Sequence, residues 1–456
     1  MSSGSGRFLK QESPGGVWDR NFRRAVGALP HCCLCEGRER NVGSVRTVLS
    51  APLGLGVRAP APSSRAAPGY LPALHAGGNG RLALDWRYHY DSPSASRHGS
   101  DSGWLSGGVT VGDPEREDRS SGCLLGGAVG DALGAPVEFV SLSEIRRRFG
   151  PNGIEQYAPA YGRVGAITDD TQMTLFTAEG LIRAMLRFQD RGICNPVAVI
   201  QHAYLRWLAT QGESNPDPTF GTNHDGWLYQ QRQLHSRRGP GSTCLSALRQ
   251  TDCGIAGRAT NDSKGCGGVM RVAPVGLIAN EPFKLGCDTA AITHGHPSGY
   301  LAAGFLAHTI AEVVRGAGLL AAIGSAQKQL ERQAGHEECT AAVAAALDAA
   351  ASSETTPESV ERLGEGWVAE EALAISLFCA LKAEDFAHGV RLAVNHSGDS
   401  DSTGAITGNL LGAQWGKHAI PEEFLADLEL REVIEQLATD LARPLGDDDY
   451  ERYPPW

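Results

Sequence analysis

Apolar residues recur at helical spacing from residue 121 to residue 442, and strand-like alternation is scarce over that stretch. Leu175, Ala178 and Ile182, for example, fall on one face of a helix. A chain with this period must bury the apolar faces of helices against one another. The sequence therefore predicts an all-α fold, built as one large helical domain with the loops of its site at one end.

The helical pattern divides into segments whose limits are marked by Gly, Pro and polar residues. The expected helices are 122–134, 168–186, 197–210, 298–315, 319–334, 337–351, 366–382, 384–395 and 405–416. In the first of these, small residues recur every three or four positions, which is typical of a buried helix whose backbone approaches a neighbour closely. Gly134 and Pro136 end that helix.

Residues 1–118 differ in kind from the rest of the chain. They are rich in Gly, Ser, Pro and Arg, and they show no sustained period of 3.6 or 2. They carry 14 Lys and Arg against 11 Asp and Glu, whereas residues 119–456 carry 27 against 41. We therefore expect a poorly ordered N-terminal extension over 1–118, a helical domain over 119–445 and a polar tail over 446–456.

The bulk composition excludes several classes of protein. A net charge of −11 argues against nucleic acid or an anionic membrane as the main partner. The 11 cysteines are scattered and odd in number, which favours a reducing compartment over a disulfide scaffold. The first residues lack the apolar core of a signal peptide, and no run of about 20 apolar residues predicts a membrane span. A cytoplasmic protein is expected.

Two short acidic clusters carry the strongest chemical signal. Thr168-Asp169-Asp170-Thr171 opens one expected helix, and Asp399, Asp401 and Ser402 lie just before another. Carboxylates and hydroxyls are the ligands that hard divalent cations such as Mg²⁺ prefer. Two such clusters, brought together by the fold, could hold two ions side by side. The alternative is structural, because Asp, Ser, Thr and Gly are also cap and turn residues.

Other candidates lie on the loops between helices. Glu138 follows the first core helix, and Asp217 and Asp225, in the long polar loop 211–241, could pair with a cationic group of a substrate. The glycine-rich turn 265–274 precedes a helix, where backbone amides can bind phosphate. His294 stands before a further helix, as a ligand contact or, equally, as a cap or core residue.

Taken in order, these motifs resemble a known family. The chain contains Gly126-x3-Gly-Asp-Ala-x-Gly-Ala-Pro-x-Glu138, Thr-Asp-Asp-Thr at 168–171, Gly-x-Gly-Gly-x-Met-Arg-Val-Ala-Pro at 265–274, Thr-His at 293–294 and Gly-Asp-x-Asp-Ser-Thr-Gly at 398–404. This ordered set resembles the ADP-ribosylglycohydrolase family over roughly residues 120–440. The resemblance implies an all-helical fold and a site for two Mg²⁺ ions, with Mn²⁺ in some members.

The resemblance also implies roles for individual residues. The metal ligands would be Thr168, Asp169, Asp170, Asp399, Asp401 and Ser402. Members of the family often have Thr where this chain has Ser402, and Ser supplies the same hydroxyl. The catalytic carboxylates would be Glu138 and Asp170. The ADP-ribose pocket would be lined by Gly265, Gly267, Gly268, Val269, Met270 and His294.

The function that the resemblance implies is metal-dependent removal of ADP-ribose from modified proteins, with ADP-ribosylarginine as the expected linkage. An alternative is an immunity protein that neutralises an ADP-ribosyltransferase toxin, by occlusion with the N-terminal arm, by de-ADP-ribosylation, or by both. The arm's Trp86-Arg87-Tyr88-His89-Tyr90 patch has the residue types that anchor interfaces, although it could equally lie on the protein's own surface. A non-catalytic member of the family is the third alternative.

Overall fold

The computed structural model describes residues 113–214, 225–250 and 252–455. The expected arm falls outside these residues, apart from 113–118, and so do its aromatic patch and Asp217. The described residues form helices joined by loops, with three isolated β-bridges and no β-strand among them. The prediction of an all-α fold is confirmed.

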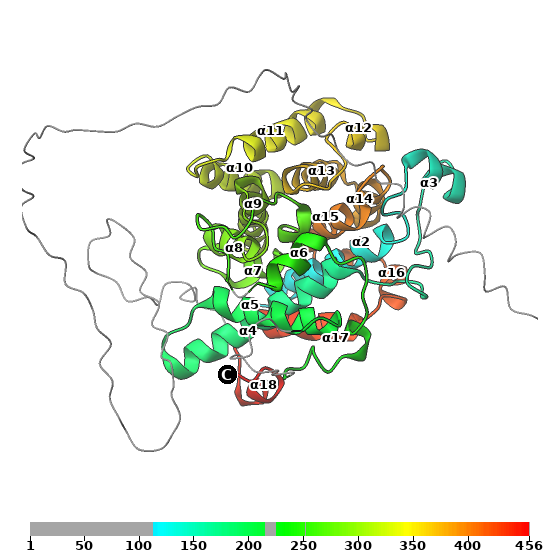
Figure 1. Ribbon diagram of the computed structural model, residues 1–456. Helices are drawn as coiled ribbons and strands as arrows, with labels where there is room; N and C mark the ends of the chain where they lie inside the picture. Colours follow the sequence, from blue (N-terminus) through cyan, green and yellow to red (C-terminus); the bar gives the residue numbers. More distant parts are fainter. Residues whose placement is uncertain (1–112, 215–224, 251, 456) are drawn as a thin grey trace, which may run out of the picture. The chain divides into compact units, whose positions relative to one another are not determined.

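The α-helices of the described residues include one close to each expected segment, with differences at the ends (Figure 1). They are α2 (Pro114–Gly134), α3 (Leu142–Phe149), α4 (Asp169–Arg191), α5 (Pro196–Thr210), α6 (Ser242–Leu248), α7 (Ala273–Ile278), α8 (Pro282–Ala291), α9 (Pro297–Val314), α10 (Leu319–Leu330), α11 (Glu337–Ser352), α12 (Pro357–Glu361), α13 (Ala369–Lys382), α14 (Phe386–Val394), α15 (Ser400–Trp415), α16 (Glu422–Ala426), α17 (Arg431–Ala442) and α18 (Asp447–Arg452).

Two helices extend beyond their predicted starts. The sequence predicts helices from 122 and 405, but α2 begins at Pro114 and α15 at Ser400. The Asp113 side chain caps α2 and Pro114 occupies its first turn, and both are favourable there. Other helices were not among the predicted segments, although α17 is amphipathic and buries Val433, Ile434 and Leu437. They are α3, α6, α8, α12, α16, α17 and α18.

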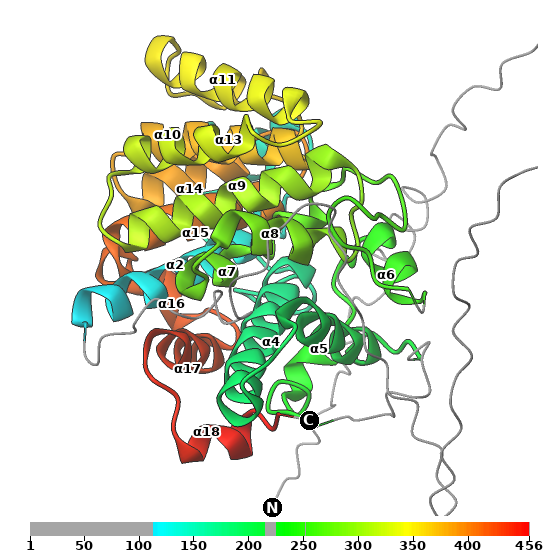
Figure 2. The same cartoon turned by 90° about the vertical axis from the view of Figure 1, so that its left-hand side faces the viewer.

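The centre of the fold is the antiparallel pair of α2 and α15, which lies between α9, α13 and α14 on one side and α4 and α17 on the other (Figures 1 and 2). A Cβ atom on Gly130 would lie 1.9 Å from the Gly404 carbonyl oxygen, and one on Gly126 would lie 2.3 Å from that of Gly408. The two backbones are therefore in direct contact, as the small-residue spacing of α2 predicts. Only glycine permits this approach.

This contact determines where the site forms. Since the helices run antiparallel, the end of α2 meets the start of α15, and a Cβ on Gly134 would lie 2.4 Å from the Ser400 carbonyl oxygen. The turn after α2 carries Glu138, and the first turn of α15 carries Asp401. No helix of the described residues is long and apolar enough to cross a bilayer.

Candidate functional site

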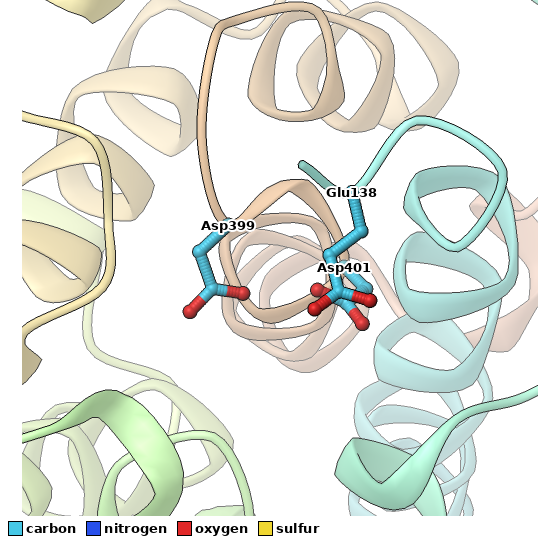
Figure 3. A group of neighbouring side chains, drawn as sticks. All are labelled: Glu138, Asp399 and Asp401. Carbon is cyan, nitrogen blue, oxygen red and sulfur yellow. The ribbon is translucent and has the colours of Figure 1, made fainter. Parts of the chain in front are cut away.

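Three carboxylates from two distant parts of the chain converge at this helix junction. One oxygen each from Glu138, Asp399 and Asp401 lies within 4.8 Å of the others (Figure 3). Both aspartates are buried, and Glu138 is partly buried in the turn that follows α2. Side chains of the same charge gather in this way when a cation compensates them, so this group is a candidate metal site.

The start of α15 presents two acids, Asp399 and Asp401, which differ in their hydrogen bonds to the helix. Asp399 is the N-cap residue, yet its side chain accepts no capping hydrogen bond from the helix. Asp401 lies in the first turn, where the positive end of the helix dipole favours a carboxylate. Asp401 Oδ1 accepts the Ser402 amide at 3.0 Å, so a capping role accounts for Asp401 in part but not for Asp399.

The other acidic cluster is held in place from α2. Thr168 caps α4, and its hydroxyl oxygen accepts from the Asp170 amide, so this residue does serve as a cap. The buried carboxylate of Asp131 accepts hydrogen bonds from the Thr168 amide at 3.0 Å, the Thr171 amide at 3.1 Å and the Thr171 hydroxyl. Asp131 thereby fixes the start of α4 relative to α2. Asp131 belongs to the sequence motif at 126–138, but its role in positioning α4 depends on the tertiary contact between α2 and α4.

Asp169 and Asp170 occupy the first two positions of α4. The Asp169 carboxylate accepts the Gly241 amide at 3.3 Å. Asp170 Oδ1 is buried and has no hydrogen-bond partner among the described residues. Burying a carboxylate oxygen without a hydrogen-bond partner costs free energy, unless a cation or another ligand binds that oxygen.

The two clusters form one site, as the loop at Gly239 shows. A Cβ on Gly239 would lie 3.1 Å from Tyr161 Oη, 3.6 Å from Asp169 Oδ1 and 3.7 Å from Glu138 Oε2. Gly239 has φ +71°, so glycine is favoured there for its backbone as well. Three side chains from separate segments therefore lie around position 239, and a side chain there would contact all three.

Burial and mutual repulsion raise the pKa of every acid in the site. Burial, then repulsion from Asp401, raises the pKa of Glu138 to about 11 and that of Asp131 to about 7. The same two causes raise the pKa of Asp169, Asp170 and Asp399 well above the ordinary range. Burial also raises the pKa of Asp401.

These residues fit a divalent cation. The donor atoms are carboxylate and hydroxyl oxygens, as hard cations require, and Asp170 Oδ1 has a free coordination position among the described residues. A positive charge would also remove the repulsion that raises the pKa values. The group drawn in Figure 3 adds Glu138 to the expected ligands Asp399 and Asp401.

A cysteine that the sequence did not single out lies against the acidic cluster. The Cys266 thiol donates to Asp399 Oδ2 at 2.8 Å, and the Ser402 hydroxyl lies 3.7 Å from the Cys266 sulfur and 3.8 Å from that of Met270. Ser402 is thus within the site, although its hydroxyl faces sulfur atoms here. Sequence alone offers no signal for this thiol, because its role depends on contact with α15.

The glycine-rich segment packs next to the acids. Cys266–Gly268 form a 3₁₀ turn, and the Cys266 amide donates to the Trp367 carbonyl oxygen at 3.2 Å. The amides of Val269 and Met270 donate to the Cys266 carbonyl oxygen. The Gly265 amide donates to the Ser263 hydroxyl at 3.4 Å. Because these four amides are used internally, phosphate binding by this segment would fall to the amides of Gly267 or Gly268. The Val269 side chain is fully buried, and Met270 is 3% exposed.

His294 is buried behind the glycine-rich segment. Burial, with a smaller effect of Arg271, lowers its pKa to about 3, so the imidazole is neutral. Thr293 Oγ1 accepts from the buried guanidinium of Arg271 at 2.7 Å and lies 2.8 Å from His294 Nδ1. A Cβ on Gly267 would lie 2.8 Å from the imidazole ring. His294 therefore supports the turn at Gly267.

Asp225 has a structural partner. Its carboxylate lies 3.3 Å from the guanidinium of the fully buried Arg183, which also pairs with buried Glu179. For Asp225, a pairing with a substrate cation was one possibility and a solvated loop acid the favoured one, and the structure gives it an ion pair within the protein. The tail also packs inward, because Tyr453 is buried and its hydroxyl donates to Asp440 at 2.7 Å.

Comparison with known proteins places this site among relatives. Residues 112–450 match the model of the ADP-ribosylglycohydrolase family. A relative from Rhodospirillum rubrum, an ADP-ribosyl-[dinitrogen reductase] glycohydrolase, is 27% identical over 70% of this chain and 92% of its own length. ADP-ribosylarginine hydrolase Tri1 from Pseudomonas putida is 23% identical over 78% of this chain and 86% of its own.

A solved structure agrees with the fold. An ADP-ribosylglycohydrolase-related protein complex matches with a TM-score of 0.50 and 27% identity, covering 72% of this chain and 99% of that one.

Proposed function

This chain belongs to the ADP-ribosylglycohydrolase family, whose members remove ADP-ribose from modified proteins, and we propose that it is an ADP-ribosylarginine hydrolase. The observation that carries the proposal is the convergence of acids from α2, α4 and α15 beside the glycine-rich segment. The arginine linkage is supported by the relative from Pseudomonas putida, which is named an ADP-ribosylarginine hydrolase.

In this proposal, Asp169, Asp170, Asp399 and Asp401, with Thr168 and Ser402, hold two Mg²⁺ ions. Bound Mg²⁺ would supply Lewis acidity, lowering the pKa of a bound water and neutralising charge near the ribose hydroxyls. Other residues of the chain hold these acids in position. Asp131 holds the start of α4 against α2, so that the acids of α4 face those of α15.

Glu138 is the proposed proton carrier. In the metal-free site, burial and the neighbouring Asp401 raise the pKa of Glu138, and the two side chains are hydrogen bonded. A bound cation would remove the repulsion, but burial, the larger cause, would still favour the protonated form of Glu138. Breaking the bond between the ribose carbon and the guanidine nitrogen leaves positive charge on the sugar ring. A carboxyl group there can give its proton to the departing nitrogen and take one from the attacking water.

The test is release of ADP-ribose from an ADP-ribosylarginyl protein, with MgCl₂ and with EDTA. We expect release that EDTA abolishes. Asp170→Asn should lower kcat/KM by about a hundredfold or more, because substitution of residues that only support metal ligands already lowers metal affinity or activity by about 10- to 100-fold. Asp348→Asn, at an exposed position of α11, is the matched control and should leave the rate unchanged. Absence of release under all conditions would contradict the proposal.

A further inference from the structure

An exposed aromatic pair borders the acidic cluster. Phe139 directly follows Glu138, its side chain is 74% exposed, and its ring stacks on that of Trp367 with centroids 4.8 Å apart and planes 21° from parallel. Its backbone is left-handed, with φ +62°. A bulky residue in this conformation costs about 1–3 kcal/mol, and such strain concentrates at functional sites. Folding of the core does not require an exposed phenyl ring at this position.

The pair is attached to the start of α15. The Phe139 amide donates to the Gly398 carbonyl oxygen at 3.2 Å, and the Asp399 amide donates to the Glu365 carbonyl oxygen at 2.8 Å. A Cβ on Gly398 would lie 2.1 Å from that same Glu365 oxygen, so the backbones touch. The two rings therefore keep a constant position relative to Glu138 and Asp399, the acids drawn in Figure 3.

A carboxylate lies at the edge of the pair. The Trp367 indole N–H donates to Glu365 Oε2 at 3.1 Å, and Glu365 is exposed. Glu371 holds this loop, because its Oε2 accepts the amides of Glu365 and Gly366 at 3.1 and 3.3 Å. The position of the Glu365 carboxylate beside the rings is thus built into the loop.

An aromatic face with a carboxylate at its edge suits a planar cation. A guanidinium group can stack on a ring with its face while its N–H groups donate to a carboxylate in the same plane. A neutral hydroxyl leaving group would gain neither contact. A lysine ammonium would gain less, because it has no planar face.

The direction of the substrate agrees with this location. The group attached to the scissile ribose carbon leads to the modified protein, which must remain in solvent. It therefore leaves the buried acids toward solvent, and Phe139, the residue after Glu138, is a large side chain exposed to solvent. We propose that Phe139, Trp367 and Glu365 bind the guanidinium of the modified arginine. This proposal rests on the proposed function and names the residues that would select its linkage.

The experiment compares two probes, ADP-ribosylagmatine and ADP-ribose, which differ by the guanidinium-bearing group. Binding is measured by calorimetry with MgCl₂ in the Asp170→Asn background, where hydrolysis is slow. We expect this parent to bind ADP-ribosylagmatine more tightly than ADP-ribose. Phe139→Leu and Glu365→Gln should each weaken the binding of ADP-ribosylagmatine by about three- to tenfold and leave the affinity for ADP-ribose unchanged.

Two further variants separate recognition from folding. Phe139→Tyr keeps the ring and should restore the preference. Phe149→Leu changes another exposed phenylalanine, at the end of α3, and should alter neither affinity. The proposal fails if the parent shows no preference for ADP-ribosylagmatine, or if Phe139→Leu changes both affinities equally or neither. If the wild-type protein releases no ADP-ribose, the proposed function is contradicted instead. The binding comparison between the two probes is independent of that outcome.

Discussion

At the scale of single residues, Gly239 is a position where a side chain would contact the site. Gly239→Ala would place a methyl group among Tyr161, Asp169 and Glu138, in a left-handed backbone conformation. The matched control is Gly192→Ala, which has nearly the same φ, +68°, and no neighbouring atom within 4 Å of the added carbon. Both variants should lose about 1 kcal/mol of stability. Only Gly239→Ala should lower kcat/KM, by about tenfold or more, measured by ADP-ribose release. Equal activity in the two would contradict this assignment.

The buried His294 should make the stability of the protein depend on pH. Burial lowers its folded-state pKa to about 3, while the ordinary value is 6.5. Between these values the unfolded state binds the proton more tightly, so stability must fall as pH decreases. From pH 7.5 to pH 5.5, this residue should cost about 1.4 kcal/mol of the free energy of unfolding. Urea unfolding at both pH values should show this difference between wild type and His294→Gln. Parallel pH profiles would contradict the assignment of a neutral, buried imidazole.

The limits of sequence reasoning also appear at this scale. Asp399 and Asp401 could be predicted, because one short motif contains them and their chemistry is local. Tyr161 and Trp367 could not, because each reaches the site only through tertiary contacts with segments far away in sequence. Asp225 was interpreted as a solvated loop acid or, less favoured, as a partner of a substrate cation, and in the structure it pairs with Arg183, 42 residues earlier. No periodicity encodes that pairing.

At the scale of helices, the contact of α2 with α15 supports both stability and the site. Gly408→Ala would place a Cβ 2.0 Å from the Gly126 carbonyl oxygen. Because this oxygen belongs to the backbone, a change of side-chain rotamer cannot relieve the clash. We expect a loss of about 1–3 kcal/mol in urea unfolding. Gly324→Ala, in α10, is the control: no atom lies within 4 Å of its Cβ, so it should gain about 0.5–1 kcal/mol. A stabilised Gly408→Ala would show that the two helices separate at little cost.

The helices themselves were predicted better than their ends. Periodicity locates buried faces, so α4, α5, α9, α10 and α11 lie where expected. The start of α2 is set by features that periodicity does not record. Its first turn is polar, and it is held by the Asp113 cap and by Arg116, whose guanidinium donates to the Leu277 carbonyl oxygen at 3.0 Å.

At the scale of the whole molecule, the expected N-terminal arm has a testable role. If it occludes a toxin, a chain that lacks residues 1–112 should no longer inhibit an ADP-ribosyltransferase in a direct assay. Hydrolysis of ADP-ribosylarginine by the same truncated chain should persist, because the family model covers residues 112–450 and the site lies within it. Unchanged inhibition would contradict the role of the arm.

The position of the truncation matters, and a pair of truncations tests why. Removing residues 1–112 keeps the Asp113 cap, Arg116 and Asp118, whose carboxylate lies 2.8 Å from His418 Nδ1. Removing residues 1–118, the boundary that composition predicts, deletes all three and leaves the Leu277 carbonyl oxygen without its donor. We expect the longer deletion to lose about 2 kcal/mol in urea unfolding relative to the shorter one. Equal stabilities would mean that α2 needs no support before Arg119, and that the compositional boundary is also the structural one.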